Sequence, residues 1–576
     1  MELLSGVFFE REEARGWWAS KPSSATSRIL CAFGALPPIT QLSWTPLVTE
    51  WAFALGREEE GLNTSLNSLP PNRVMVSLPQ RSLHPDTPYW YVTNIAFIED
   101  AVLEIGADDG AQVYLERVRI PVTGEHFFVP SCPNGCELIV RVLNKAVYGG
   151  LEWVRFVGRT EFERQRMQAE FRKELSLCVH KFALLREPSD EQIGALQRAI
   201  EIGSLEALHT AQETLSALPC CVVGPLLQKA TTHSISVLWE TDVPCIASLL
   251  LGTEDEPIQR LLASSEGTLH VVELTDLQPN TTYTYRILNG PLLSAVTTFC
   301  TLPSAGGFAF TAWADPQVNA FSSKNRDVFA QNVNLLRSIP VAFTVGVGDL
   351  VENGNQKEPW LYFFERLSPL ASRVPTMLVG GNHEYDGCFE DLRSPYLVRY
   401  LRGNPTSQYF AWSVGNARCV ALDPNSYYPT GIPVGSAARE WFLQELESSE
   451  WRLAKWHFLF IHQPPFSQGW LDYEGDIPIR KMLEPLFSQH QIDFVISGHT
   501  HDYEHLERVY GEQRVHFLVL GGAGGGVEAG GLSAEPVMDQ VIRRHHIGHF
   551  VVEAESVRFC AIATDTRVLD SFVVQK

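Results

Sequence analysis

The chain has 576 residues, which exceeds what one hydrophobic core normally supports, so three or four domains are expected. It has the composition of a globular protein, with 45% hydrophobic and 19% charged residues. Its formal net charge of −22 disfavours duplex nucleic acid as a partner, because phosphate backbones bind basic surfaces. A phosphorylated small substrate is not excluded, because metal ions can dominate the local charge of a site.

Compartment and redox state are read from the first residues and the cysteines. No stretch of about 20 apolar residues occurs, so no membrane span is expected. The first residues, MELLSGVFFEREEARGWW, lack the basic leader of a signal peptide. A cytoplasmic location is therefore expected. The eleven cysteines are scattered without the paired spacing of a zinc site, which favours free thiols.

Residues 1–160 read as short strands separated by turn clusters and are predicted to form an N-terminal β-sandwich. The expected strands include Tyr89–Ile98, Ala101–Ile105, Gln112–Leu115 and Glu137–Val142. The stretch LEIGADDGAQVYLERVRIPVTG, followed by CELIVRVLNKAVYGGLEW, resembles the sugar-binding, jelly-roll-like domains attached to many glycosidases. That resemblance implies a galactose-binding-like unit with carbohydrate as a partner.

The tryptophans of this part admit two interpretations. They could form a platform for carbohydrate, or they could fill the core of the sandwich, which is the commoner use of such side chains. The residues concerned are Trp17, Trp18, Trp44, Trp51, Trp90 and Trp153.

Residues 161–219 change to a helical pattern and are predicted to link the β units. Apolar residues recur from Phe162 to Val179 among charged ones. Ser189 is the expected N-cap of a second helix, and a third is expected over Ser204–Leu218. A helical segment between β units is most simply a spacer that packs on both neighbours.

Residues 220–302 return to short strands. Alternation over Ser234–Trp239 predicts a half-buried strand, and Pro279-Asn280 turns into Thr282–Tyr285. The motifs VVGPLLQ, DLQPNTTYTYRI and FCTLP resemble the fibronectin-III-like domain that precedes the catalytic domain of purple acid phosphatases.

Residues 303–576 alternate apolar strands and amphipathic helices, which predicts an α/β domain. The expected strands are Phe308–Ala314, Val341–Val347, Thr376–Val379, Cys419–Leu422, His457–Ile461, Phe494–Ile496 and Val515–Leu520. The expected helices are Arg326–Arg337, Pro359–Leu370, Ala437–Leu446 and Ile479–His490.

Polar residues with metal-binding chemistry follow five of these strands directly. They are Asp315, Asp349, Asn382-His383, His462 and His499-Thr500-His501. Each group alone has a structural explanation, such as a turn or a helix cap, but packing alone does not account for all five positions. Carboxylates, one amide oxygen and three imidazoles suit borderline divalent ions such as Mn, Fe, Zn or Ni better than Ca.

This series is similar to that of the calcineurin-like metallophosphoesterases, and the preceding fibronectin-like unit narrows the likeness to the purple-acid-phosphatase-like branch. The motifs that carry it are VGDLVENG, WLYFFERLSPLASRVPTMLVGGNHEYDG, YFAWSVGNARCVALD, WFLQELESSEWRLAKWHFLFIHQPPFSQG and FVISGHTHDYEHLERV. The resemblance implies an α/β/β/α sandwich and two divalent or mixed-valence ions of Fe, Mn or Zn. By the same resemblance, one ion takes Asp315, Asp349 and His501, and the other takes Asp349, Asn382, His462 and His499. His383 then lies beside the scissile phosphate.

Two positions depart from the branch. Glu352 stands where purple enzymes have the tyrosine that colours their ferric ion. Gln317 stands where the branch has glycine and many relatives have a ligand histidine, so its amide oxygen could bind the first metal or hold a water beside it. The stretch GGAGGGVEAGG lacks the Lys-Ser/Thr of a P-loop and is interpreted as a flexible rim.

The resemblance implies a phosphomonoesterase in which two cations activate a bridging water, and the resulting hydroxide attacks phosphorus. His383 is the candidate general acid for the leaving alcohol. Two alternatives stay open. One is a phosphodiesterase acting on nucleotides or lipid head groups, and the other is a carbohydrate-binding protein with an inactive phosphoesterase domain.

Overall fold

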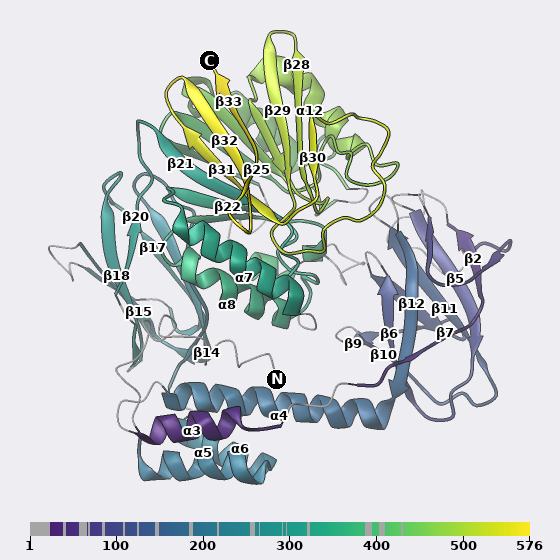
Figure 1. Ribbon diagram of the computed structural model, residues 1–576. Helices are drawn as coiled ribbons and strands as arrows, with labels where there is room; N and C mark the ends of the chain where they lie inside the picture. Colours follow the sequence, from purple (N-terminus) through teal and green to yellow (C-terminus); the bar gives the residue numbers. More distant parts are fainter. Residues whose placement is uncertain are drawn as a thin grey trace.

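A computed structural model gives the fold of the chain (Figure 1). It describes residues 24–37, 42–56, 66, 69–82, 84, 87–107, 110–123, 126–144, 149–183, 188–215, 218–253, 260–263, 265–290, 292–294, 296–319, 323–385, 394–401, 409–427 and 430–576. These residues form a β-rich N-terminal unit, a helical layer, a second β-rich unit and a larger α/β unit.

The N-terminal unit consists of two antiparallel sheets around one hydrophobic cluster. One sheet runs in the order β1 (Thr45–Pro46), β12 (Gly149–Gly158), β6 (Ala101–Ala107), β10 (His126–Val129) and β9 (Val122–Thr123), with β4 (Gln80–Ser82) also paired to β12. The other runs β3 (Val74–Val76), β2 (Trp51–Leu55), β5 (Thr87–Ile95), β11 (Cys136–Asn144), β7 (Ala111–Leu115) and β8 (Val118–Ile120). Leu103 and Val154 from the first sheet pack with Tyr91 and Val140 from the second.

The tryptophans of this unit divide between core and surface. Trp51 and Trp90 are 0% exposed, which confirms the core interpretation for these two. Trp44 and Trp153 are half-buried or exposed, and the guanidinium of Arg155 lies 5.2 and 4.5 Å from their ring centroids. The predictions for Trp17 and Trp18 lie outside the described residues.

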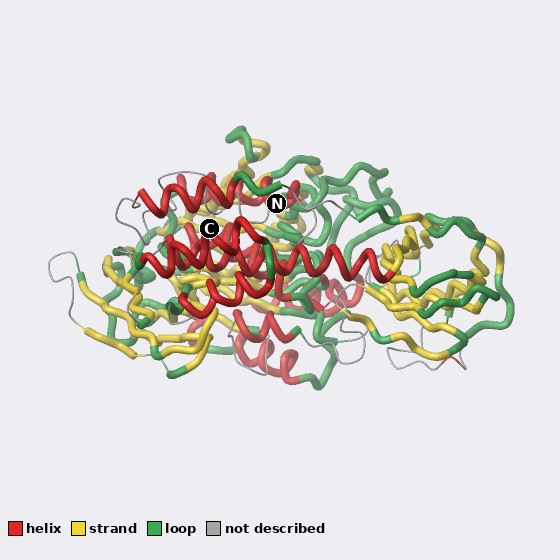
Figure 2. Tube along the Cα trace, turned by 90° about the horizontal axis from the view of Figure 1, so that it is seen from below, coloured by secondary structure: helices red, strands yellow, loops and turns green. Residues whose placement is uncertain are grey.

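The helical layer consists of α3 (Ser24–Gly34), α4 (Arg159–Ala183), α5 (Asp190–Ile202) and α6 (Leu205–Leu215), which share one hydrophobic cluster. Figure 2 views the molecule from the side of this layer, and the long α4 runs across it. Ser189 caps α5 as predicted: its side chain accepts the N–H of Gln192, whose own side chain accepts the N–H of Ser189.

The second β-rich unit pairs β13 (Cys221–Gln228), β14 (Ile235–Cys245) and β17 (Gly267–Leu274) in one sheet. The other sheet holds β16 (Arg260–Ala263), β15 (Ala247–Gly252), β18 (Thr282–Asn289), β19 (Leu292–Leu293) and β20 (Thr297–Cys300). Alternate residues of β18 are buried, because successive side chains of a strand point to opposite faces.

The α/β unit contains two facing sheets. The first runs β23 (Thr376–Val379), β22 (Phe343–Val347), β21 (Phe308–Trp313), β31 (His546–Val552), β32 (Ser556–Ala563) and β33 (Val568–Gln575). The second runs β24 (Phe410–Val414), β25 (Ala417–Leu422), β26 (Trp456–Ile461), β27 (Phe494–Ser497), β29 (Gln513–Leu520), β28 (Tyr503–Tyr510) and β30 (Gln540–Ile542). Phenylalanines fill the space between them, for example Phe310, whose ring stacks on Phe550 and meets Phe458 edge-on.

Helices cover the outer face of each sheet. On the first sheet, α7 (Ser323–Ser338) and α8 (Lys357–Ala371) bury Phe329 and Phe363. On the second, α10 (Ala437–Leu446) and α12 (Ile477–His490) bury Phe442 and Leu483. Short α9 (Pro395–Tyr400), α11 (Ser449–Leu453) and the 3₁₀ turn His383–Tyr385 complete the unit. The predicted succession of helix, sheet, sheet and helix layers is present.

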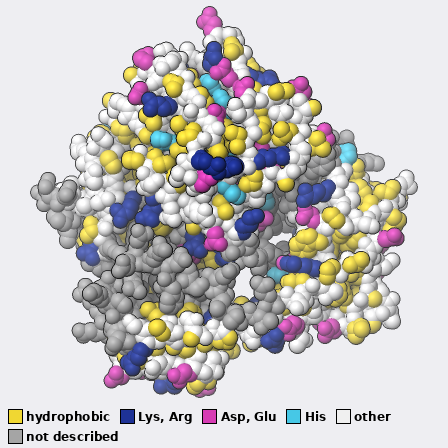
Figure 3. Space-filling model, in the orientation of Figure 1, with side chains coloured by type: hydrophobic (Ala, Val, Ile, Leu, Met, Phe, Trp, Pro, Cys, Tyr) yellow, Lys and Arg dark blue, Asp and Glu magenta, His cyan; other side chains and the backbone are white. Residues whose placement is uncertain are grey.

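Surface charge and helix hydrophobicity bear on the expectations drawn from composition. On the face shown in Figure 3, Lys and Arg side chains lie singly or in small groups beside acidic ones. Among the helices of the described residues, none combines the length and apolar character needed to cross a membrane.

Candidate metal centre

The polar groups singled out from the sequence lie where parallel strands of the two sheets end. β21, β22 and β23 are parallel neighbours, as are β25, β26 and β27. Asp315 follows β21, Asp349 follows β22 and Asn382 follows β23, while His462 follows β26 and the pair His499 and His501 follows β27. Because parallel strands present their carboxyl ends to one edge, these loops meet at one place.

Four residues of these loops have left-handed backbone angles, which are uncommon for side chains other than glycine. The φ angles are +59° at Asp315, +38° at Gln317, +49° at Asp349 and +76° at His499. Each such residue costs of order 1–3 kcal/mol, and strained residues of this kind concentrate at functional sites. Gln317 has the same unusual conformation as Asp315, Asp349 and His499, which is consistent with a place in the same site.

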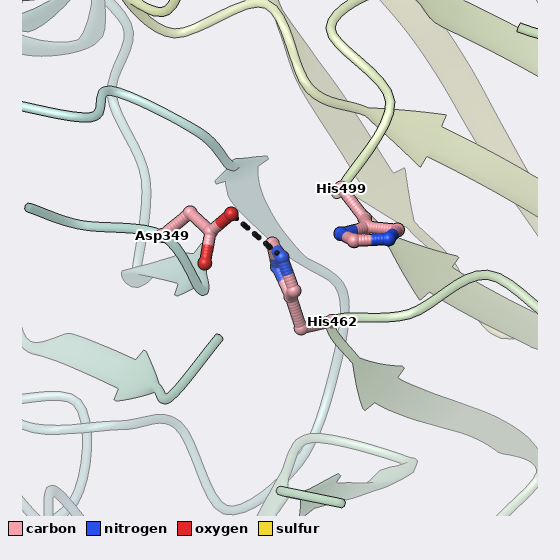
Figure 4. A group of neighbouring side chains, drawn as sticks. All are labelled: Asp349, His462 and His499. Carbon is pink, nitrogen blue, oxygen red and sulfur yellow. Dashed lines mark ion pairs between the residues drawn. The ribbon is translucent and has the colours of Figure 1, made fainter. Parts of the chain in front are cut away.

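Asp349, His462 and His499 form the closest cluster (Figure 4). One ligand atom from each lies within 4.8 Å of the others, and all three residues are buried. Nε2 of His462 is 3.1 Å from Oδ2 of Asp349, while Nδ1 of His462 lies 2.8 Å from the carbonyl oxygen of Val347. That contact fixes the ring and leaves Nε2 directed at the carboxylate, as in histidines that bind metal ions.

Asp315 and His501 form the other side of the site. Nε2 of His501 is 3.7 Å from Oδ1 of Asp315, and Nε2 of His462 is 3.9 Å from the same oxygen. Nδ1 of His501 lies 2.9 Å from the carbonyl oxygen of Gly526, so this ring too presents Nε2 to the site. The backbone N–H of His499 donates to Asp315 at 2.9 Å and holds its carboxylate in place.

Gln317 lies beside His501. Its backbone N–H donates to the carbonyl oxygen of Asp349 at 2.9 Å, and its side chain is buried. A Cβ added at Gly525 would lie 3.0 Å from Oε1 of Gln317 and 2.8 Å from Cε1 of His501. The amide oxygen of Gln317 therefore faces the same side of the site as His501.

Asn382 stands at the end of a buried chain of amide groups. Nε2 of Gln463 donates to Oδ1 of Asn382 at 3.5 Å and to the side chain of Asn425. Asn425 donates to Asp423, which also accepts the hydroxyl of Tyr385 at 2.8 Å. This chain orients the amide of Asn382, and the sequence motifs gave no sign of it.

His383 lies beside Asp349, and its two ring nitrogens have different partners. Nδ1 is 3.0 Å from the carbonyl oxygen of Glu352, and Nε2 is 3.9 Å from Oδ2 of Asp349. Its backbone N–H donates to Oδ1 of Asp349 at 3.0 Å. The ring is partly accessible, so Nε2 can reach a ligand held by the neighbouring groups.

Glu384 supports the loops of the site, and sequence reasoning gave it no role. Its carboxylate is fully buried and accepts the backbone N–H groups of Asp349, Leu350, Val351 and Gly381 at 2.7–3.1 Å. It thereby ties the loop that carries Asp349 to the loop that carries Asn382. Its place inside the Gly-Asn-His-Glu motif was the available signal.

The glycine-rich stretch forms a wall of the site. The prediction of a flexible rim is wrong for residues 521–525, which are buried. Gly525 donates its N–H to the carbonyl oxygen of Asp315 at 2.7 Å, and Ala523 donates to Ala314 at 3.0 Å. A Cβ at Gly521 would lie 1.9 Å from the carbonyl oxygen of Thr500, so this close approach requires glycine.

The charges of the site are mutually dependent. Burial raises the pKa of Asp315 well above its usual range, and the charge of Asp349 adds to this. Burial also opposes ionisation of Asp349, but His462 and His383 hold its pKa well below its usual range. Burial lowers the pKa of His462, while Asp349 and Asp315 raise it more, to about 9. Bound cations would stabilise both carboxylates as anions.

The donor set fits one or two borderline divalent ions. Burial and the neighbouring His462 lower the pKa of His499 to about 3, so this imidazole is neutral, which is the form that binds a metal ion. The carboxylates of Asp315 and Asp349 supply negative charge, and the histidine rings are oriented by backbone carbonyls.

Comparison with known proteins gives relatives for the part of the chain that holds this site. The family model described as calcineurin-like phosphoesterase matches residues 308–503. Purple acid phosphatase 22 of Arabidopsis thaliana is 28% identical over 257 residues, which cover 42% of this chain and 55% of that protein. Probable purple acid phosphatase 20 of the same plant is 25% identical over 269 residues, covering 43% of this chain and 58% of that protein. The chain thus spans little more than half the length of these curated relatives.

A solved structure shares the fold over most of the chain. The purple acid phosphatase PPD1 from seeds of yellow lupin (Lupinus luteus) superposes with a TM-score of 0.54 at 14% identity. The superposition covers 86% of this chain and 93% of the lupin protein.

Proposed function

We propose that this chain hydrolyses phosphate monoesters at a two-metal centre. Its residues 308–503 form a calcineurin-like phosphoesterase domain of the purple-acid-phosphatase-like kind. The observation that carries the proposal is the convergence of five strand ends on one buried group of carboxylates and imidazoles, where four residues are held in left-handed conformations.

The proposed ligands divide into two sets that share one carboxylate. Asp349 would belong to both sets. Asp315, His501 and the amide oxygen of Gln317 complete the first set, and Asn382, His462 and His499 complete the second. The 3.7 Å separation of His501 from Asp315 and the 3.1 Å separation of His462 from Asp349 support this division.

When bound, two such cations supply positive charge for the phosphate oxygens and an activated water. The chain supplies the rest. The carboxylates of Asp315 and Asp349 balance the positive charge. Glu384 holds the loop of Asp349 beside the loop of Asn382 through hydrogen bonds to their backbones. Nε2 of His383 delivers a proton to the departing alcohol, while Nδ1 is held by the carbonyl oxygen of Glu352.

The units outside this domain belong to the proposal as well. We assign residues 1–160 to a β-sandwich of galactose-binding-like type, 161–219 to a helical linker, 220–302 to a fibronectin-III-like unit and 303–576 to the phosphoesterase domain. The two-sheet organisation of each β-rich unit supports this division.

The test is metal analysis paired with a panel of esters. Purified protein is expected to bind about two ions of Mn, Zn or Fe and to hydrolyse para-nitrophenyl phosphate faster than bis(para-nitrophenyl) phosphate. The reverse preference would favour the phosphodiesterase alternative. Absence of both bound metal and turnover would overturn the proposal and favour an inactive domain.

Two variants sharpen this test. Asp349→Ala and His462→Ala are expected to lose bound metal and activity while the far-ultraviolet circular dichroism spectrum is retained. His209→Ala is the matched control, because His209 lies on α6 with its side chain 73% exposed. Full metal content in the Asp349 variant would contradict the bridging role.

A further inference from the structure

A tryptophan lies against a proposed metal ligand without belonging to the donor set. The ring centroid of Trp470 is 5.0 Å from that of His499, in an edge-to-face arrangement. Tyr473 lies 5.2 Å from Trp470 and 6.0 Å from His499. His499 and Tyr473 are buried, whereas Trp470 is only half-buried, so Trp470 is the outermost ring of this group.

Hydrogen bonds to Glu504 hold the loop that carries Trp470. The carboxylate of Glu504 accepts the hydroxyl of Ser467 at 2.6 Å and the backbone N–H groups of Gln468 and Gly469 at 2.6 and 3.2 Å. These bonds fix the three residues that lead into Trp470. The indole is therefore held at a set position beside His499.

The same loop is tied to the segment that follows the glycine-rich wall. The side chain of Gln468 donates to the carbonyl oxygen of Ser533 at 2.8 Å and accepts the N–H of Met538 at 3.1 Å. Arg543 donates to the carbonyl oxygen of Gly469 at 3.0 Å. These bonds join the two loops into one border beside the site.

Apolar side chains continue this border toward solvent. Leu471 is 49% exposed and Leu532 is 43% exposed. Leu471 is close to Gly531, because a Cβ added at Gly531 would lie 3.6 Å from Cδ1 of Leu471. A half-buried indole followed in the chain by an exposed leucine is a surface on which a flat apolar group can stack.

We propose that Trp470 and Leu471 form a subsite for a flat aromatic group on the organic part of the substrate, such as a nucleobase. This rests on the proposed function and names its substrate class: phosphate monoesters that carry an aromatic ring. Because the indole of Trp470 contacts His499, it lies within reach of the organic group of a phosphate held there. Stacking of a base on an aromatic side chain changes affinity by roughly tenfold or more.

The experiment compares two esters whose scissile oxygen belongs to the same kind of alcohol. Adenosine 5′-monophosphate and ribose 5-phosphate both release a primary ribose hydroxyl, so the base is the difference to be recognised. The metal-loaded full chain is expected to prefer the nucleotide by roughly tenfold in kcat/KM. In Trp470→Ala this ratio falls toward one, and in Trp470→Phe most of it is retained.

A matched variant separates recognition from damage. Trp441 is also half-buried and packs against Tyr409 at 4.7 Å, on α10. Trp441→Ala is expected to keep the wild-type ratio. If Trp470→Ala lowers both rates equally and leaves the ratio unchanged, the subsite proposal is wrong and Trp470 only supports the fold.

Binding of non-hydrolysable analogues distinguishes failure of the subsite from failure of the proposed function. Calorimetry on the metal-loaded chain is expected to show phenylphosphonate binding roughly tenfold tighter than methylphosphonate, and this difference is lost in Trp470→Ala. Such a preference without turnover of any ester would overturn the hydrolase proposal and leave the subsite standing. Equal binding of the two phosphonates would overturn the subsite.

Discussion

At the scale of single residues, the site depends on side chains that hold other side chains. The carboxylate of Glu384 accepts backbone N–H groups from the loops of Asp349 and of Asn382. Satisfied backbone donors keep Asp349 in its left-handed conformation, with φ of +49°. The conformation of the Asp349 loop is therefore set by Glu384, which is not among the proposed ligands.

Glu384→Gln tests this dependence. The amide would turn its NH₂ group toward backbone donors, leaving a buried N–H without an acceptor, which costs about 1–3 kcal/mol. We expect the free energy of unfolding to fall by about that amount and metal affinity to fall at least tenfold. Urea unfolding and equilibrium dialysis against Mn measure the two effects. Unchanged metal affinity would show that the loops hold their positions without Glu384.

His383 gives a prediction about leaving groups. If Nε2 donates the proton to the departing alcohol, His383→Ala should lower kcat by about 10²–10⁴-fold for alkyl phosphates. The loss should be much smaller for para-nitrophenyl phosphate, whose leaving group needs little protonation. Steady-state kinetics on both esters, with metal content checked, decides the matter. Equal losses on the two esters would instead assign His383 to orienting Asp349.

The proposed metal ligands could be singled out from the sequence as a set, because each follows an apolar strand directly and strand ends are visible in the sequence. Glu384 lies inside a visible motif, but its backbone partners on the Asp349 loop are 33–35 residues away, and Gln463 is 81 residues from Asn382, so the motifs show neither pairing. The strained conformation of Gln317 was also invisible, since it depends on the bond from its N–H to Asp349.

At the scale of elements, the apolar runs predicted most strands and helices of the α/β unit to within a few residues. β23 and α10 have the predicted bounds, and α7 begins at Ser323 where Arg326 was expected. The strands β24, β28 and β30 of the second sheet were not predicted, and neither were β31, β32 and β33. The last three join the first sheet because β31 pairs with β21, where Phe308 faces Val552, and such distant pairing leaves no local signal.

Glu240 on β14 joins the second β-rich unit to the α/β unit. Its buried carboxylate accepts Nζ of Lys357 at 2.8 Å, the hydroxyl of Tyr400 at 2.6 Å and Nη2 of Arg399 at 3.1 Å. Burial alone would raise the pKa of Glu240, but these three donors outweigh burial and lower it. The charged form is therefore favoured in the folded protein.

This shift predicts a pH-dependent stability. A depressed carboxyl pKa contributes stability that is present above the unfolded value, about 4.5, and is lost as pH falls through the folded value. Glu240→Gln should lower the free energy of unfolding by about 2 kcal/mol at pH 7. The difference from wild type should shrink below pH 4.5. Urea unfolding at pH 7 and pH 4 measures it.

Glu358→Gln is the control for that series, because Glu358 pairs with Lys173 at the surface, where both side chains are about half exposed. This variant should lose less than about 1 kcal/mol. A constant difference between Glu240→Gln and wild type across the pH range would show that the carboxylate charge does not stabilise the junction.

At the scale of the whole molecule, α4 connects the N-terminal unit to the rest (Figure 1). It follows β12 without a break, since β12 ends at Gly158 and α4 begins at Arg159. Its first turns pack Phe162 against Val102 and Val157 of the N-terminal unit. Near its other end, Lys181 pairs with Asp242 of β14 at 2.7 Å, and both side chains are more than 90% buried. The helical pattern was readable from the sequence, but this docking pair was not, because neither residue marks a motif.

The buried pair predicts that α4 and β14 open together. Lys181→Met leaves the carboxylate of Asp242 buried without its partner, which costs about 3–5 kcal/mol. Hydrogen exchange followed by mass spectrometry is expected to show faster exchange, by roughly 100- to 1,000-fold, in peptides from both α4 and β14. Adding Asp242→Asn to Lys181→Met should recover part of the loss, because two contacting residues do not contribute additively. Lys173→Met, on the same helix with an exposed partner, is the control and should change exchange little. Faster exchange confined to α4 in Lys181→Met would mean that the helix is not coupled to the second β-rich unit through this pair.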